Sequence, residues 1–267
     1  VGALIAAARA EGFTLRFPAE ETVKHKLRAE PGIEVDATPS GDDGICIALG
    51  GDGTILQGLR TYARTGVPVF GVNFGEIGFL ATLDPDDDID AGLRKALRGE
   101  FEVLSLPGIE VVHGGKRWLA MNDVSFHRQP GMRVADLAVE VGDEEVGRVR
   151  CDGLVVATPA GSTGYNLANG GPVMAWGVEG LAVSYIAPHS LTARALVVAP
   201  HDPIRIRNRS REEPVDVSVD GRPVGELPPE GTVIARFVDD VGALAQAPGA
   251  SFYHRLREKF GRMASGA

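Results

Sequence analysis

The chain has 267 residues, of which 44% are hydrophobic and 24% are charged, so it can bury the core of one large domain or of two smaller ones. Its formal net charge of −9 argues against nucleic acid and anionic membranes as partners, because either partner requires a basic face. No apolar run approaches the roughly 20 residues that span a bilayer, and the N-terminus lacks the pattern of a signal peptide. We therefore expect a folded cytoplasmic protein whose two cysteines, Cys46 and Cys151, stay reduced.

Helical and strand-like patterns alternate through the first hundred residues. The expected elements are a helix that ends at Gly12, strands at 13–17, 44–50 and 67–72, and helices after Gly53 and at 89–100. This alternation is typical of an α/β domain with a parallel sheet. The acidic run "DPDDDID" at 84–90 lacks the glycine and glutamate of a calcium loop, so we expect it to cap the helix that follows.

After Pro107, apolar and polar residues alternate with a period of two between turns of Gly, Pro and Asp, which predicts a mostly β, sandwich-like domain. The last stretch places Phe252, Leu256 and Phe260 four apart on one helical face, which predicts a helix that packs on a partner surface. The predicted domains are an α/β domain over 1–107 together with the returning helix 250–267, and a β-rich domain over 108–249.

The stretch "GGDGT" at 50–54 joins an expected strand to an expected helix. Such a turn aims backbone N–H groups at one point, which is an anion site by geometry. It is not a P-loop, because no lysine follows the glycines, and Leu56 and Asn73 stand where the dinucleotide fingerprint requires a glycine and an acid. Phosphate repels the carboxylate of Asp52 unless a metal intervenes or the carboxylate accepts a proton from a hydroxyl nucleophile. Asp52 is therefore either a general base or only a helix cap, and the stretch alone leaves both open.

Two further segments carry polar residues where a nucleotide could bind. Residues 151–173 form a strand that runs into a turn with Ser162 and Thr163, whose hydroxyl and N–H groups suit phosphates and ribose, although the segment could equally be a loop of a sandwich. In "LAMNDVSFHR" the apolar flanks argue against a turn at Asn122 and Asp123. We expect this pair inside a strand, where a ligand satisfies it, since a carboxamide pairs with an adenine edge and a carboxylate with ribose hydroxyls.

Five motifs resemble, in their order, the motif set of the NAD kinases. They are "GGDGT" at 50–54, "NFGEIGFL" at 73–80, "ND" at 122–123, "DGLVVATPAGSTGY" at 152–165 and "SVDG" at 218–221. The first motif is shared with diacylglycerol, sphingosine and phosphofructo-kinases, whereas the later motifs in this order are specific. The fold of that family is an α/β domain plus a β-sandwich-like domain with a returning C-terminal helix, which agrees with the patterns above.

The resemblance implies an enzyme that phosphorylates the 2′-hydroxyl of the adenosine ribose of NAD. The phosphate donor would be ATP or polyphosphate. The cofactor would be a divalent metal such as Mg²⁺, and the resemblance does not identify its ligands. The protein would be a homodimer or homotetramer. By this resemblance Asp52 accepts the hydroxyl proton, Phe79 lines the adenine side, and the turn of Gly50, Gly51, Gly53 and Thr54 faces the donor phosphates. The implied NAD-binding residues are Asp52, Gly53, Phe79, Asn122, Asp123, Arg150, Asp152, Thr163, Gly164, Tyr165, Asn166, Leu167, Ala168, Ala187 and Arg222.

The sequence departs from the family pattern at a few positions. Ala160 stands where a hydroxyl residue is common, Gly164 replaces the usual Ala, and Asp123 replaces the usual Glu. The family normally begins with a strand before its first helix, whereas this sequence opens directly on the helical stretch "ALIAAARAEG"; the sheet loses one element if that strand is truly absent and none if a preceding segment supplies it, and the role of Asp52 is the same in either case. The alternative functions are a lipid or sugar kinase that shares the first motif, and a catalytically silent nucleotide sensor.

Overall fold

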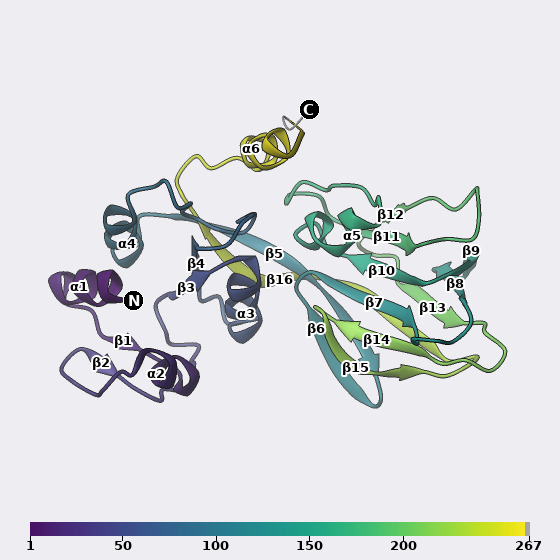
Figure 1. Cartoon of the computed structure of the whole chain (residues 1–267), viewed down its shortest axis with the longest axis horizontal. Helices are drawn as coiled ribbons and strands as arrows, with labels where there is room; N and C mark the ends of the chain where they lie inside the picture. The colour runs from purple at the N-terminus through teal and green to yellow at the C-terminus, as the bar shows by residue number, and fades with distance from the viewer. Residues whose placement is uncertain (265–267) are drawn as a thin grey trace. The chain divides into compact units, whose positions relative to one another are not determined.

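The computed structural model describes residues 1–264 and divides into two compact units (Figure 1). Each unit has a hydrophobic core of its own. Unit 1 consists of Val1–Ser105 and the chain from Gly242 onward, and unit 2 consists of Leu106–Val241. Unit 1 combines a parallel sheet with helices and unit 2 is mostly strands, so the predicted fold class is confirmed. Among the described residues, no helix is both long enough and apolar enough to cross a membrane.

Unit 1 is an α/β domain built on a short parallel sheet. Strand β3 (Cys46–Gly50) pairs with β4 (Val69–Asn73), and β4 pairs with the end of β16 (Thr232–Gln246) through Val69 and Leu244. The remaining elements of the first 105 residues are two short parallel strands, β1 (Leu15–Arg16) and β2 (Ile33–Glu34), and the helices α1 (Gly2–Glu11), α2 (Ala19–His25), α3 (Asp52–Thr61) and α4 (Ile89–Leu97).

Local sequence explains where the helices of unit 1 begin and end. Helix α1 ends at Gly12, whose φ of 77° lies in the left-handed region that glycine adopts without strain. Helix α4 begins after Asp88, whose side chain accepts a hydrogen bond from a backbone N–H of the first turn, so the acidic run caps this helix as predicted. Both helices contribute to one core, in which Leu4 and Leu93 pack with Phe70 of β4.

Unit 2 contains two antiparallel sheets. The first has the strand order β12-β11-β10-β7-β14-β15, and the second continues from the first part of β16 through β13 and β8 to β9, with β5 and β6 as a hairpin. The bounds are β5 (Glu102–His113), β6 (Lys116–Ala120), β7 (Asp123–Arg128), β8 (Ala135–Val141), β9 (Glu144–Cys151), β10 (Gly153–Ala157), β11 (Leu181–Ile186), β12 (Leu196–Val198), β13 (Ile204–Asn208), β14 (Val215–Val219) and β15 (Arg222–Leu227), with two short helices, η1 (Gly161–Thr163) and α5 (Tyr165–Ala168).

The core of unit 2 sets which side chains face away from it. Phe126 of β7 and Ile206 of β13, one from each sheet, belong to the same fully buried cluster. Because successive side chains of a strand point to opposite faces, the other face of β7 carries Asp123, Ser125 and His127. The one candidate NAD-binding residue of this strand, Asp123, therefore lies on the face that does not form the core.

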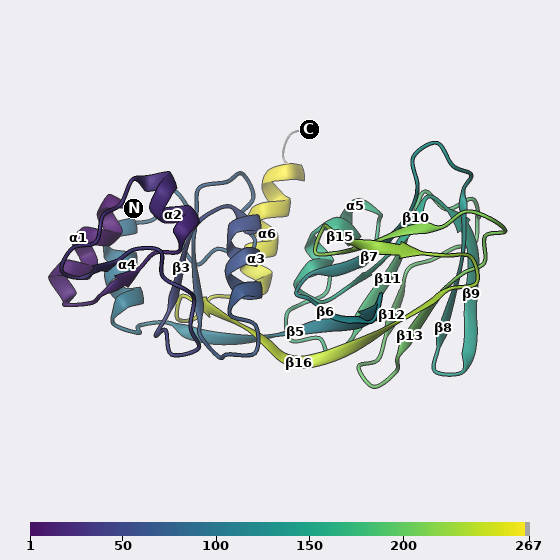
Figure 2. The same cartoon turned by 90° about the horizontal axis from the view of Figure 1, so that it is seen from below.

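The C-terminal helix α6 (Phe252–Ala264) packs on unit 1, as predicted. The ring of Phe79 makes edge contacts with Phe252 and Phe260, at centroid distances of 5.8 and 6.3 Å. Residues 242–249, which the sequence analysis assigned to the β-rich domain, are grouped by the structure with unit 1. The reason is that β16 is one long strand (Figure 2). Its first part pairs with β13 and its last part pairs with β4.

Candidate functional site

The first motif lies at the turn that joins β3 to α3. Strand β3 ends at Gly50 and α3 begins at Asp52, with Gly51 as the N-cap residue and no side-chain capping bond. A Cβ at Gly50 would meet Oγ1 of Thr54 at 2.3 Å, so packing within the turn requires glycine there. A Cβ at Gly53 would have nothing within 4 Å. The packing of the protein itself therefore does not account for the glycine at position 53.

Asp52 is held by a distant loop rather than by its own helix. Its Oδ2 accepts the backbone N–H of Phe79 and its Oδ1 accepts that of Leu80, both at 2.9 Å. The carboxylate thus does not serve as a side-chain cap of α3, which was the alternative that the sequence left open. A carboxylate has about four lone-pair positions, so each oxygen keeps capacity for another hydrogen donor or a cation.

The loop that holds Asp52 is the second motif. Asn73 at the end of β4 is 1% exposed; its Oδ1 accepts the N–H of Gly75 at 2.8 Å and its Nδ2 donates to Asp84 at 3.1 Å. A Cβ at Gly75 would stand 3.0 Å from Cα of Gly51, so the two motifs approach each other through glycines. Burial acts to raise the pKa of Asp84, but hydrogen bonds from Lys259 and Asn73 outweigh it and the pKa is lowered.

Asn122 lies at a break between two strands and Asp123 is the first residue of the second strand, so the prediction that both sit inside one strand is wrong for Asn122. Strand β6 ends at Ala120, β7 begins at Asp123, and the chain bends between them. Asp220, which follows β14, stabilises the bend, because its carboxylate accepts the backbone N–H groups of Met121 (3.0 Å), Asn122 (2.7 Å) and Asp123 (3.2 Å). The N–H of Asp220 donates in return to the carbonyl of Asp123 at 2.9 Å.

The fourth motif packs directly on this bend. The N–H of Thr158 donates to the carbonyl of Asn122 at 2.9 Å, and its Oγ1 donates to the carbonyl of Met121 at 2.7 Å. A Cβ at Gly161 would lie 2.0 Å from the Asn122 carbonyl oxygen, so only glycine fits there. Unit 2 therefore brings the third, fourth and fifth motifs together at one place.

The ionisable groups at this place have shifted pKa values. Asp123 is 7% exposed, and burial together with the nearby carboxylate of Asp220 raises its pKa to about 7. The ring of Tyr165 stacks on that of His127 with centroids 5.6 Å apart and an angle of 13°. Burial, and then the charge of Asp123, raises the pKa of Tyr165, whereas burial lowers the pKa of His127 against the opposing charge of Asp216.

Two carboxamide groups in the same region have buried oxygens. Oδ1 of Asn122 is buried and has no hydrogen-bond partner within the described part of the chain. Asn166 is fully buried and donates through Nδ2 to the carbonyls of Ser162 and Pro172, at 3.0 and 2.9 Å, while its Oδ1 also lacks a partner there. A buried acceptor without a donor costs about 1–3 kcal/mol. A ligand with N–H or O–H groups would remove that cost at Asn122.

Comparison with known proteins identifies the family. The family model described as ATP-NAD kinase N-terminal domain matches residues 19–101, and the one described as ATP-NAD kinase C-terminal domain matches residues 121–238. The NAD kinase of Gemmatimonas aurantiaca is 34% identical over 97% of this chain and 89% of its own length. The chain belongs to the NAD kinase family. NAD kinase 2 of Streptomyces coelicolor is likewise 34% identical, over 93% of this chain and 90% of its own length.

Solved structures of NAD kinases have the same fold. The yeast NADH kinase complexed with NADH aligns with a TM-score of 0.81 and 23% identity, over 97% of this chain and 83% of that one. The NAD kinase from Archaeoglobus fulgidus in complex with ATP aligns with a TM-score of 0.72 and 27% identity, over 95% of this chain and 100% of that one. Together with the family models, these matches place both units within the NAD kinase fold.

The other residues that resemble NAD-binding positions of the NAD kinases have varied surroundings. Four of them, Thr163, Gly164, Leu167 and Ala168, lie in or beside η1 and α5. Arg150 is exposed near the end of β9, and Arg222 is exposed at the start of β15. Asp152 forms an ion pair with Arg128, and Ala187 follows β11 with a φ of 43°. Phe79 is 4% exposed and packs on α6. Its ring is covered within unit 1. Its place beside an adenine stays a prediction.

Asp52 is the carboxylate of the candidate site that fits a metal ion bound together with a phosphate donor. Among residues 1–264, no group of three or more His, Cys, Asp or Glu side chains could hold a metal. Mg²⁺ in phosphoryl-transfer sites needs only one or two carboxylates, since phosphates and waters complete its shell. Asp52, with lone pairs left on both oxygens, is a carboxylate of this kind, so the residues fit a metal that enters with the donor.

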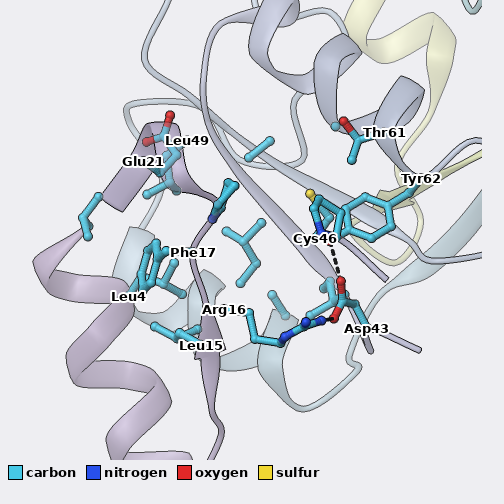
Figure 3. A pocket seen from close by; sticks show the side chains of 18 of the residues that line it. Leu4, Leu15, Arg16, Phe17, Glu21, Asp43, Cys46, Leu49, Thr61 and Tyr62 are labelled. Atoms are coloured by element: carbon cyan, nitrogen blue, oxygen red, sulfur yellow. Dashed lines mark hydrogen bonds and ion pairs between the residues drawn. The ribbon is translucent and has the colours of Figure 1, made fainter. Parts of the chain in front are cut away.

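Unit 1 also contains a cavity of about 1000 Å³ between α2, β1, β3 and α3 (Figure 3). Arg16 and Tyr62 both point to Asp43 on its wall, and the Tyr62 hydroxyl donates to that carboxylate at 2.6 Å. Thr54 and Phe74 are its lining residues from the five NAD kinase motifs. The cavity is therefore largely separate from the candidate site.

Two residues that hold the motifs in place, Asp220 and Arg255, were not predicted from the sequence. Asp220 lies in a matched motif, but an Asp-Gly pair is also typical of a hairpin turn. The sequence therefore does not indicate the hydrogen bonds that its carboxylate accepts from residues 121–123. Arg255 of α6 donates to backbone carbonyls between positions 78 and 81. No pattern of side chains signals a bond whose acceptors are carbonyl groups.

Proposed function

We propose that this protein transfers the terminal phosphoryl group of ATP to the 2′-hydroxyl of the adenosine ribose of NAD, which yields NADP. One observation carries the proposal. A chain that is 34% identical to an NAD kinase over 97% of its length keeps a carboxylate, Asp52, fixed by two backbone N–H groups at the N-terminus of α3. That carboxylate retains lone pairs with which it can accept a proton.

In the proposed mechanism, Asp52 accepts the proton of the ribose 2′-hydroxyl as the oxygen attacks the terminal phosphorus of the donor. The O–H bond breaks toward Asp52, the new O–P bond forms, and the bond to the leaving ADP oxygen breaks in line. The hydrogen bonds from Phe79 and Leu80 fix the carboxylate before the substrate arrives. Catalysis then depends mainly on positioning and on charge neutralisation.

The donor phosphates would lie at the turn of Gly50, Gly51, Gly53 and Thr54, where the first N–H groups of α3 are directed. The open space beside Gly53 supports this assignment, because a ligand can approach the backbone there. A divalent metal, Mg²⁺, held by the donor phosphates and Asp52, would neutralise phosphate charge. ATP is the donor we propose, with polyphosphate as the alternative, since the Archaeoglobus fulgidus relative was solved in complex with ATP.

Unit 2 would bind the adenosine half of NAD. The unpartnered Oδ1 of Asn122 suits the exocyclic amino group of adenine, which is a hydrogen donor. Asp123, with a pKa of about 7, can accept from or donate to ribose hydroxyls. The residues that we propose to complete the NAD site are Arg150, Asp152, Thr163, Gly164, Tyr165, Asn166, Leu167, Ala168, Ala187 and Arg222.

We also propose, from the family resemblance, that the protein is a homodimer or homotetramer, and, from its two unpaired cysteines, that it works in the cytoplasm. A size measurement by light scattering tests the first statement, and imaging of a tagged chain tests the second.

The experiment that tests the function is incubation of the protein with NAD, ATP and Mg²⁺, with NADP measured by a dehydrogenase specific for it. We expect NADP from the wild type and a loss of about 100-fold or more with Asp52→Asn, since general-base catalysis contributes about 10²–10⁴-fold. Tight binding of NAD without any NADP would favour the nucleotide sensor. Phosphorylation of a lipid or a sugar instead of NAD would favour the alternative kinases, and full turnover by Asp52→Asn would refute the role of the base.

A further inference from the structure

The loop that holds Asp52 is itself held by the C-terminal helix. Arg255 of α6 donates through Nη1 to the carbonyl oxygens of Gly78 and Phe79, at 3.3 and 3.1 Å, and also to that of Ala81. The N–H groups of Phe79 and Leu80 donate to Asp52. One short loop, residues 78–81, therefore uses its carbonyl groups for a cation and its N–H groups for the candidate base.

Further contacts fix α6 against the same loop. Lys259, whose side chain is 10% exposed, donates to Asp84 at 2.8 Å, and Asp84 also accepts from Asn73 at 3.1 Å. The rings of Phe252 and Phe260 pack on Phe79. The helix thus contacts the end of the second motif and the residues that directly follow it, so a movement of α6 would move the residues that bind Asp52.

Arg255 is suited to this role by its charge. Burial lowers its pKa, while the negative charges of Asp84 and Asp52 oppose that shift. A half-buried cation needs compensating partners, and here the loop carbonyls and these carboxylates supply them. Hydrogen bonds from a charged donor are roughly twice as strong as neutral ones, so the guanidinium constrains the loop more than a neutral side chain would.

On the basis of the proposed function, we propose that Arg255 is a positioning residue of the phosphoryl-transfer site. It acts through the backbone of residues 78–81 to hold the carboxylate of Asp52 in the orientation that accepts the ribose proton. Arg255 itself touches neither substrate in this proposal. Its effect on catalysis is large because a displacement of about 1 Å at a reacting group can cost about 100-fold in rate.

The first test compares three variants in steady-state kinetics. Arg255→Met keeps the length of the side chain and removes its donors, Arg255→Lys keeps a cation, and Arg257→Met is the matched control, because Arg257 is exposed on the same helix and bonds to His254. We expect Arg255→Met to lower kcat by about 10- to 100-fold with less than about 3-fold change in KM for NAD and ATP. We expect Arg255→Lys to recover part of the loss and Arg257→Met to behave as the wild type.

The second test asks whether the effect passes through Asp52. In an Asp52→Asn background, Arg255→Met should lower kcat by less than about 3-fold more, since the group it positions is already disabled. Amide hydrogen exchange of Phe79 and Leu80, followed by NMR, should be faster by about 10-fold in Arg255→Met and unchanged in Arg257→Met. Exchange requires no turnover, so it tests the loop contact even if the protein makes no NADP, in which case the proposed function fails on its own.

Several results would overturn the proposal. Wild-type kcat and wild-type exchange in Arg255→Met would do so, as would a loss confined to KM, or an equal loss in Arg257→Met. If Arg255→Met does not fold, Arg255→Lys decides the question. A kcat at least about 3-fold below wild type at an unchanged melting temperature supports the role, and a kcat and exchange equal to wild type contradict it.

Discussion

Asp220 gives the clearest energetic prediction, because its single carboxylate satisfies three consecutive backbone N–H groups of the bend at 121–123. The perturbations are Asp220→Asn and Asp220→Ala. Asp220 has a φ of 47°, a left-handed conformation that Asn tolerates better than Ala does. Asp220→Asn therefore removes charge and acceptor capacity without added backbone strain, whereas Asp220→Ala adds that strain.

The magnitude follows from the geometry of these bonds. A hydrogen bond to a charged group contributes about 1.5–3 kcal/mol, and the bond to Asp123, at 3.2 Å, contributes least. Two effects reduce the sum, since water can reach the half-buried Asn122 and loss of the Asp220 charge relieves its repulsion with Asp123. We expect a net loss of about 2–4 kcal/mol in the free energy of unfolding for Asp220→Ala, and about half of that for Asp220→Asn.

The assay is thermal unfolding combined with calorimetric titration of NAD. A loss of 1 kcal/mol lowers Tm by about 2–4 °C for a domain of 150–250 residues, so Asp220→Ala should melt several degrees below the wild type and bind NAD about 10-fold more weakly or worse. Asp239→Ala, an exposed change on β16, is the control and should stay within about 0.5 kcal/mol. If Asp220→Ala matched that control in both Tm and affinity, the positioning argument for the bend would be wrong.

Two further predictions concern Asp123 and the glycines. Folding raises the pKa of Asp123 from 3.8 to about 7, so the stabilisation from its protonated form is complete below pH 3.8 and is lost as the pH rises through 7. The loss in the free energy of unfolding is at most about 4 kcal/mol. Urea unfolding at pH 4 to 8 should show this loss in the wild type and not in Asp123→Asn, and parallel curves would contradict it. Gly53→Ala should leave Tm within about 1 °C, because the added Cβ meets no protein atom, yet lower kcat/KM at least about 10-fold, because that Cβ occupies the open space in which the donor is proposed to bind. Gly161→Ala should instead lower Tm, because its Cβ meets the Asn122 carbonyl. Equal Tm values for the two variants would refute this distinction.

The elements of unit 1 could be predicted because their signals are local. The glycine that ends α1 and the aspartate that caps α4 each act within one turn of their own helix. The pattern of Phe252 and Phe260 likewise predicted an apolar face for α6, and the structure gives that face a partner in Phe79. Such signals depend only on neighbours in the sequence, so they predict an element without knowledge of the fold.

The bend at Asn122 could not be predicted, because the group that stabilises it lies far along the chain. Asp220 is separated from Asn122 by 98 positions, and the apolar neighbours of the bend resemble those of a strand. The same reason applies to Asp52, whose partners Phe79 and Leu80 lie in another motif. The sequence indicated which residues carry chemistry, whereas the contacts that orient them are long-range and appear only in the fold.

The measurement that tests the central claim most directly is the position of the transferred phosphate. The wild type is incubated with NAD, ATP and Mg²⁺, and the product is examined by phosphorus and proton NMR. The account predicts one new phosphomonoester, on the 2′-oxygen of the adenosine ribose, formed together with one ADP and strongly diminished in Asp52→Asn. Release of ADP with no phosphate on NAD, or a phosphate at any other oxygen, would contradict it.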